Sequence, residues 1–240
     1  NNTALGKGAL AAATTSDDNT AVGYDALGAN TTGTQNIAVG TLALDASTTA
    51  SYNTAMGYAA MGANTSGTYN TGLGSGALLV NTTGSSNTSV GMNSMDANTT
   101  GGSNTAVGTS ALGANTTASY NVAVGTDALL SNTTGTGNTA MGAHALDAAT
   151  TADNNTALGK SSLSTNTTGA TNVAIGRDAL YANTTGSDNV AVGTYALDAN
   201  TTASNNTTVG SESMSATTTG TQNTAMGKAS MGANIDGNYN

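Results

Sequence analysis

Residues that could carry out acid–base or metal chemistry are scarce in this chain. It has one histidine, His144, one glutamate, Glu212, no cysteine, and aspartates scattered along its length. General acid–base and nucleophilic catalysis need such groups in close pairs or triads, and this set is too sparse to provide them. The chain also lacks a Gly-rich loop followed by Lys-Ser/Thr and lacks the Gly-Gly-x-Gly-x-Asp repeat that binds calcium. We therefore expect no catalytic residue, no metal site, no cofactor and no enzymatic activity.

A second kind of chemistry, glycan attachment, is indicated by a recurring Asn-Thr-Thr or Asn-Thr-Ser triplet. Each triplet is formally an N-glycosylation acceptor, and the candidate sites include Asn30, Asn81, Asn115 and Asn183. The alternative is structural: an Asn at a turn, whose amide bonds the local backbone and the stacked copies of itself. The spacing favours the structural interpretation, because strands about 4.8 Å apart leave little room for a bulky glycan on every copy.

The elements that position these residues follow from an internal repeat without slippage. The 17-residue phrase Asn-Thr-Ala-Val-Gly-x-x-Ala-Leu-x-Ala-Asn-Thr-Thr-Gly-x-x occurs fourteen times, and its Asn is called position 1 below. A fixed short period is typical of stacked repeat architectures, in which each unit contacts only its neighbours. The sequence predicts one array over residues 1–240, taken from a longer fibre, with coils that begin at residues 2, 19, 36, 53, 70, 87, 104, 121, 138, 155, 172, 189, 206 and 223.

Each copy is predicted to form one coil of an all-β, parallel β-solenoid. Gly at position 5 and the Asn-Thr-Thr segment at positions 12–14 oppose a helix. A short strand around positions 2–5, a bend, a second extended piece near positions 8–11 and an Asn-initiated return fit better. The bend is assigned to the invariant glycines of position 5, among them Gly23, Gly40, Gly57, Gly125 and Gly176.

Two positions of the repeat are predicted to fill the core. Position 4 is a large apolar residue and position 9 is Leu or Met in every copy, whereas position 8 is always Ala or Ser and allows close approach. Two large side chains per coil make a thin core, so we expect a homo-oligomer, with a trimer favoured, and end-to-end filaments as a further form of self-association. The predicted core residues include Val22, Leu27, Val39, Leu44, Val107, Leu112, Val124, Leu129, Ile175, Leu180, Val192 and Leu197.

The charged residues mark the surface of the predicted coil and exclude several partners. All four basic residues fall at position 6, and twelve of the thirteen acids fall at positions 7, 10, 16 or 17, so these positions are predicted to face solvent. A net charge of −9 with four basic residues argues against nucleic-acid binding. No apolar run approaches the roughly 18 residues of a membrane span.

The repeat phrase resembles those of known fibre proteins over the whole chain. The phrase Asn-x-Ala-Val/Ile-Gly at residues 121–125 and 172–176 resembles the head repeats of trimeric autotransporter adhesins. The fuller phrase at residues 19–33 is similar to repeats of phage tail fibres and large bacterial surface proteins. The resemblance implies a left-handed β-roll and a homotrimer, with Val22, Val124, Ile175 and their equivalents at the trimer core. The chain departs from the adhesin head repeats in its extra Asn-Thr-Thr-Gly segment.

These observations predict a structural segment of an extracellular fibre, located at a cell surface or on a virion. The alternative is an adhesin module that recognises cell-surface sugars through corner residues such as Tyr24, Asp25, Tyr58, Tyr181 and Tyr195. For such a site we expect aromatic residues clustered on neighbouring coils. A third alternative is an ice-binding solenoid, in which the Thr columns of positions 13 and 14, with position 2, present ordered hydroxyl groups.

Overall fold

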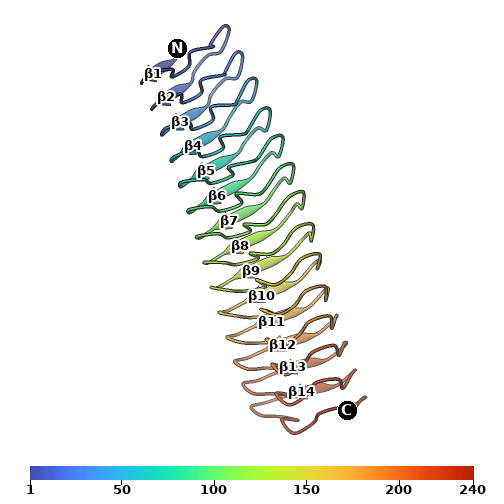
Figure 1. Cartoon of the computed structure of the whole chain (residues 1–240). Coiled ribbons are helices and arrows are strands. Elements are labelled where there is room, and N and C mark those ends of the chain that lie inside the picture. Colours follow the sequence, from blue (N-terminus) through green and yellow to red (C-terminus); the bar gives the residue numbers. More distant parts are fainter. The chain divides into compact units, whose positions relative to one another are not determined.

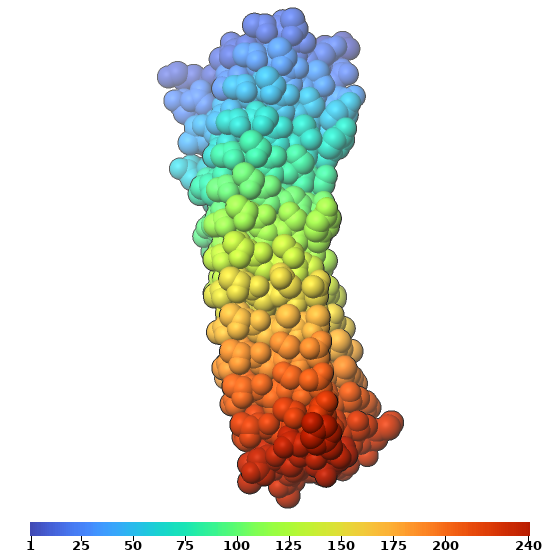
Figure 2. Space-filling view, turned by 90° about the vertical axis from the view of Figure 1, so that its right-hand side faces the viewer, coloured from blue at the N-terminus to red at the C-terminus, as the bar shows by residue number.

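The computed structural model describes residues 1–240 and shows an all-β, parallel β-solenoid (Figure 1). The chain forms two compact units, Asn1–Tyr120 and Asn121–Asn240, and the description below applies to each unit by itself. Strands β1 to β7 belong to the first unit and β8 to β14 to the second, and they follow one another in chain order. In the space-filling view the residues of each unit lie in bands that follow the sequence, as expected where every coil is one layer (Figure 2).

Every strand spans three residues, at positions 2–4 of the repeat. The structure thus confirms the predicted first strand, with position 5 outside it. The strands are β1 (Thr3–Leu5), β2 (Thr20–Val22), β3 (Ile37–Val39), β4 (Thr54–Met56), β5 (Thr71–Leu73), β6 (Thr88–Val90), β7 (Thr105–Val107), β8 (Val122–Val124), β9 (Thr139–Met141), β10 (Thr156–Leu158), β11 (Val173–Ile175), β12 (Val190–Val192), β13 (Thr207–Val209) and β14 (Thr224–Met226).

Neighbouring strands pair in parallel, with identical repeat positions opposite each other. In the pair β2–β3, for example, Ala21 lies opposite Ala38 and Val22 opposite Val39. The same register holds in the second unit, where Ala157 of β10 pairs with Ala174 of β11. This register follows from a period without insertions. A shift of one residue in the pairing would turn every side chain of the strand to the opposite face of the sheet.

The segment after each strand differs from the prediction. The second extended piece expected near positions 8–11 is absent, and positions 6–11 form turns instead. Positions 7 and 9 adopt left-handed backbone conformations, as in Asp25 with φ 51° and Leu27 with φ 50°. Their amides bond to neighbouring coils on opposite sides, because Asp25 N donates to Lys7 O at 2.9 Å and Leu27 N donates to Ala43 O at 3.0 Å. These bonds offset a conformation that costs a leucine roughly 1–2 kcal/mol.

The core of each unit is a column of position-9 side chains surrounded by alanines. This confirms the prediction for Leu27, Leu44, Leu112, Leu129, Leu180 and Leu197, which are all fully buried. The alanines of positions 3 and 8, such as Ala21 and Ala26, are buried beside them. Each coil therefore contributes one large apolar side chain to the interior, and small residues let the walls approach.

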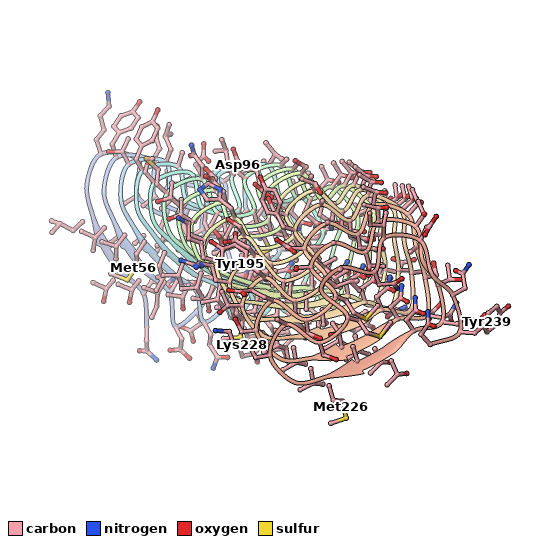
Figure 3. All side chains as sticks on the ribbon, turned by 90° about the horizontal axis from the view of Figure 1, so that it is seen from below. Met56, Asp96, Tyr195, Met226, Lys228 and Tyr239 are labelled. Atoms are coloured by element: carbon pink, nitrogen blue, oxygen red, sulfur yellow. The ribbon has the colours of Figure 1, made fainter.

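The prediction that position 4 also fills the interior of the coil was wrong. Val107 and Ile175 are each 37% exposed, and the other predicted members, Val22, Val39, Val124 and Val192, are partly exposed. Successive residues of a strand point to opposite faces, so an inward Ala at position 3 turns position 4 outward. Met56 and Met226 likewise extend outward from β4 and β14 (Figure 3). Position 4 is an apolar column on the surface of each unit.

Two columns of buried asparagines complete the interior. At position 1, Asn172 N donates to Asn155 Oδ1 at 2.9 Å, and Asn172 Nδ2 donates to Gly186 O at 2.8 Å. At position 12, Asn183 Nδ2 donates to Gly186 O at 3.0 Å. Buried polar groups are tolerated only when they are hydrogen-bonded, and these amides bond both their own coil and its neighbour. They tie the return segment of the coil to the strand.

Candidate functional site

An open groove of about 500 Å³ lies on the unit Asn121–Asn240. Its walls come from three consecutive coils, which begin at residues 155, 172 and 189, and only from repeat positions 6, 7 and 10. These positions follow the Gly bend and vary along the chain, because their side chains take no part in the asparagine columns. The lining residues are Lys160, Ser161, Arg177, Asp178, Tyr181, Tyr195 and Asp198.

Arg177 lines this groove and comes from the middle one of its three coils. The Cζ atom of its guanidinium is 4.8 Å from the centroid of the Tyr195 ring, and its Nε is 3.4 Å from Oδ2 of Asp178. The backbone fixes these partners, because Tyr195 N donates to Arg177 O and Asp178 N donates to Lys160 O, both at 3.1 Å. A cation over an aromatic face and beside a carboxylate has a restricted orientation. The guanidinium is therefore held in place while part of it stays open to solvent.

Asp198 is the carboxylate of the groove whose hydrogen bonding is incomplete. Its Oδ1 atom is buried and has no hydrogen-bond partner. Burial raises the pKa of Asp198 above its usual value, and the nearby charges of Asp178 and Glu212 raise it further, whereas the amides of Asp198 and Ala199 act in the opposite direction. The site therefore has an acceptor that lacks a donor.

A second polar cluster on the same unit surrounds the only histidine. Nδ1 of His144 lies 3.7 Å from Oδ2 of Asp127 and 3.6 Å from Oδ2 of Asp147. The scattered aspartates of the sequence did not indicate this arrangement, in which Asp127 comes from the preceding coil and Asp147 from the same coil as His144. The structure contains no group of three histidine, cysteine, aspartate or glutamate side chains that could hold a metal ion.

The glycines assigned to the bend have the backbone that the prediction requires. Gly23, Gly40, Gly57, Gly125 and Gly176 have φ values between 130° and 140°. A Cβ on Gly176 would lie 2.6 Å from the backbone carbonyl of Gly193 in the next coil. Position 5 thus requires glycine for its conformation and also for its distance to the neighbouring coil.

The candidate glycosylation sites are located inside the solenoid. The side chains of Asn30, Asn81, Asn115 and Asn183 are fully buried and bonded to backbone carbonyl groups of their own coils. A glycan on these amides has no path to solvent in the folded chain. The interpretation of the triplets as acceptors is therefore wrong for the folded protein, and the alternative, an asparagine ladder, is what the structure contains.

The threonine columns considered for ice binding differ in whether their hydroxyl groups are available to solvent. At position 13 the hydroxyl is used within the solenoid, as where Thr31 Oγ1 donates to Thr48 O at 3.0 Å and Thr184 Oγ1 to Thr201 O at 2.9 Å. At position 14 the side chains of Thr32 and Thr185 are exposed. One column of hydroxyl groups therefore serves the contacts between coils rather than the surface.

The tyrosines at the corner positions are distributed over both units and have different neighbours. Tyr181 and Tyr195 both line the groove, whereas Tyr24 and Tyr58 belong to the other unit. Tyr24 contacts Lys7, whose Nζ is 5.9 Å from the ring centroid. The pair Tyr52 and Tyr69, at position 17 of adjacent coils, stacks with ring centroids 4.9 Å apart and an interplanar angle of 9°. Aromatic residues of neighbouring coils thus do meet, which the scattered sequence positions concealed.

Comparison with known proteins gives no relative: no protein-family model, no curated protein and no solved structure matches this chain. None of its segments is an apolar helix long enough to cross a membrane. The features that indicate a function are the groove, the surface columns and the bonds between coils.

Proposed function

We propose that this chain is a structural segment of an extracellular fibre, such as the shaft or head of a filament, an adhesin or a phage tail fibre. Its role is mechanical: it holds another part of the fibre at a fixed distance from a cell or virion. The observation that carries this proposal is the pair of buried asparagine columns, in which side-chain amides join each coil to its neighbour, as Asn172 joins Asn155 and Asn183 joins Asn166.

The arrangement of the bonds suits such a role. Strand bonds, turn bonds such as Leu163 N to Ala179 O at 3.0 Å, and asparagine bonds all connect adjacent coils. Separating two coils requires breaking these bonds together, so resistance along the stacking direction is shared among many of them. Charged residues make up 7% of the chain, so its stability should depend little on ionic strength.

The apolar column of position 4 supports self-association as part of this proposal. Met141 and Ile175 of the second unit are 46% and 37% exposed, and Met56 of the first unit is 46% exposed. Burying such side chains against another copy contributes about 25 cal/mol per Å² of apolar surface. We propose a homo-oligomer, with a trimer as the favoured state, in which this column faces the partner copies.

A register-preserving deletion tests the spacer role. Removing residues 53–103 takes out three whole coils and joins position 17 to position 1. The expected result is an unchanged β-type circular dichroism spectrum and a particle shortened by about 14 Å in small-angle scattering, since coils stack about 4.8 Å apart. Deleting residues 53–100, which ends within a coil, is the matched control and should disrupt folding. Equal particle lengths for the three-coil deletion and the parent chain would contradict the spacer role.

Sedimentation equilibrium tests the oligomer separately. A mass three times 23.0 kDa supports the trimer, and replacing Met141 and Ile175 by Asp should lower that mass toward a single chain. A single-chain mass for the parent protein would end the oligomer proposal without affecting the spacer role.

A further inference from the structure

We propose that the groove lined by Lys160, Arg177, Tyr181, Tyr195 and Asp198 binds a neutral saccharide. This inference goes beyond the spacer function and does not depend on it. It rests on three features of the groove: its aromatic surface, its balance of charge and its incomplete hydrogen bonding.

The aromatic surface comes from two tyrosines on adjacent coils. Tyr181 is 45% exposed and Tyr195 is 36% exposed, and both line the groove. Because Arg177 already covers one face of the Tyr195 ring, Tyr181 is the ring left open to a ligand. A pyranose ring has an apolar C–H face of matching size, and an amphipathic tyrosine pairs with such a surface while its hydroxyl remains solvated.

The charges of the groove favour a ligand without a net charge. Lys160 and Arg177 contribute two positive groups, and Asp178 and Asp198 contribute two negative groups. An anionic ligand would face both carboxylates, and a cationic ligand would face both cations. Sugar hydroxyl groups, by contrast, both donate and accept hydrogen bonds, so they can use the two kinds of partner together.

The unpartnered oxygen of Asp198 adds a specific reason for a hydroxyl donor. A buried acceptor without a donor is unfavourable, and Oδ1 of Asp198 is such an acceptor. A small rotation of the carboxylate toward the groove would allow a ligand hydroxyl to donate to it. The fixed guanidinium of Arg177, held by Asp178 and Tyr195, presents donors to a neighbouring hydroxyl at little cost in side-chain entropy.

The groove depends on residues at repeat positions that vary from coil to coil. The coil that begins at residue 121 has Thr126, Asp127 and Leu130 at the three lining positions, and the next coil has Ala143, His144 and Asp147. Neither combination provides an aromatic ring beside an arginine. Because the side chains at positions 6, 7 and 10 are outside the core and the asparagine columns, they can vary without disturbing the solenoid, and a binding site can be placed there.

The test uses the full chain and a panel of defined sugars. The probes are the methyl glycosides of glucose, galactose, mannose and N-acetylglucosamine, with glucuronate as the anionic counterpart, in saturation-transfer NMR titrations. The expected result is saturable binding of at least one neutral glycoside. Tyr181→Ala and Arg177→Ala should each weaken that binding about tenfold, the loss of one hydrogen bond to a charged group or one stacking contact.

The matched control is Tyr239→Ala. Tyr239 is 79% exposed, belongs to the same unit and lies outside the groove, near the C-terminus (Figure 3), so its loss should leave the affinity unchanged. Circular dichroism shows whether each variant keeps the fold. The proposal is overturned if no neutral glycoside binds, if glucuronate alone binds, or if the folded Tyr181→Ala and Arg177→Ala variants bind as tightly as the parent chain.

Discussion

The side-chain amide of Asn183 donates a 2.8 Å hydrogen bond to Oδ1 of Asn166, one coil earlier, and both side chains are fully buried. The same amide donates to Gly186 O at 3.0 Å, and Asn183 Oδ1 accepts from Asn200 Nδ2 at 2.7 Å. One asparagine thereby connects three successive coils. The asparagine of a triplet that looks like a glycan acceptor in the sequence thus belongs to a polar column of the interior.

Asn183→Ala should destabilise the protein by about 2–3 kcal/mol, because it removes these bonds and leaves buried groups unpaired. Urea unfolding followed by circular dichroism measures the effect. Thr185→Ala, an exposed position of the same coil, is the control and should change the free energy of unfolding by less than about 0.5 kcal/mol. Equal midpoints for the two variants would show that the column contributes nothing to stability.

Thr217→Asn should stabilise the protein. Position 12 carries Thr217 where most coils have asparagine, and Oδ1 of Asn200, one coil earlier, is buried without a partner. Thr217 instead donates to Asn234 O at 2.8 Å. An asparagine amide would supply the missing donor, with a gain of about 1 kcal/mol.

Thermal unfolding of Thr217→Asn and of the exposed control Thr219→Asn gives the comparison. A higher midpoint is expected for Thr217→Asn alone. A lower midpoint would mean that the bond from Thr217 to Asn234 is worth more than the restored column.

Gly176→Ala should destabilise the protein by about 3 kcal/mol or more, since it combines backbone strain with overpacking. Its φ is 130°, and the added Cβ would lie 2.6 Å from the backbone of Gly193. Gly137→Ala separates the two causes. Gly137 also has a positive φ, 70°, but the nearest atom to its added Cβ is the movable side chain of Asn154.

Gly137→Ala should therefore cost only about 1 kcal/mol, the strain alone. Chemical denaturation of both variants measures the difference. A similar loss for the two glycines would indicate that conformation, rather than the distance between coils, explains the invariant glycine of position 5.

The free energy of unfolding should rise as the pH falls from neutral. Burial is the main cause that raises the pKa of Asp45 and of Asp96 above the ordinary value of 3.8. A carboxyl whose pKa is raised in the folded state favours folding when protonated, so its contribution is complete below about pH 3.8 and is lost as the pH rises through the raised pKa. The double variant Asp45→Asn/Asp96→Asn should be more stable than the parent at pH 7.

Urea midpoints at pH 4 and pH 7 test this expectation. The double variant should show a smaller difference between the two pH values than the parent chain. Asp236→Asn removes an exposed carboxylate and should leave the difference nearly unchanged. A parent chain that is more stable at pH 7 than at pH 4 would contradict the assigned sign.

Expression in a host that glycosylates secreted proteins should leave Asn30, Asn81, Asn115 and Asn183 unmodified once the chain has folded, because their amides are buried. Intact mass spectrometry of the secreted protein gives the answer directly. A mass equal to that of the bare sequence agrees with the structure. Glycan mass that maps to these asparagines in folded protein would contradict the burial of the position-12 column.

Much of the architecture could be predicted from the period alone. A 17-residue repeat without slippage fixes parallel pairing in register, which places Ala21 opposite Ala38, and invariant Leu27-type and Gly23-type residues mark the core and the bend. The direction of Val22 could not be predicted in this way. Alternation shows that Ala21 and Val22 face opposite sides, but size suggested that valine should be inside, whereas the inward position of the narrow coil is alanine in most copies.

The turn over positions 6–11 could not be predicted from the sequence for a different reason. Leucine rarely adopts a left-handed backbone, so no propensity indicates it for Leu27 with φ 50°. Bonds to the neighbouring coils impose that conformation, and they are visible only once the coils are stacked. The groove could not be predicted for the same reason, since Arg177 and Tyr195 belong to different copies of the repeat, at positions 6 and 7, and become neighbours only when the coils stack.

Because the backbone bonds between coils recur at the same repeat positions from copy to copy, the 17-residue copy is the unit in which the length of the solenoid can change. Unequal recombination that gains or loses whole 17-residue copies recreates these backbone bonds at the new junction, whereas any other change of length misaligns them. Selection can therefore adjust the number of coils in steps of one copy, while the corner positions diversify independently on each copy.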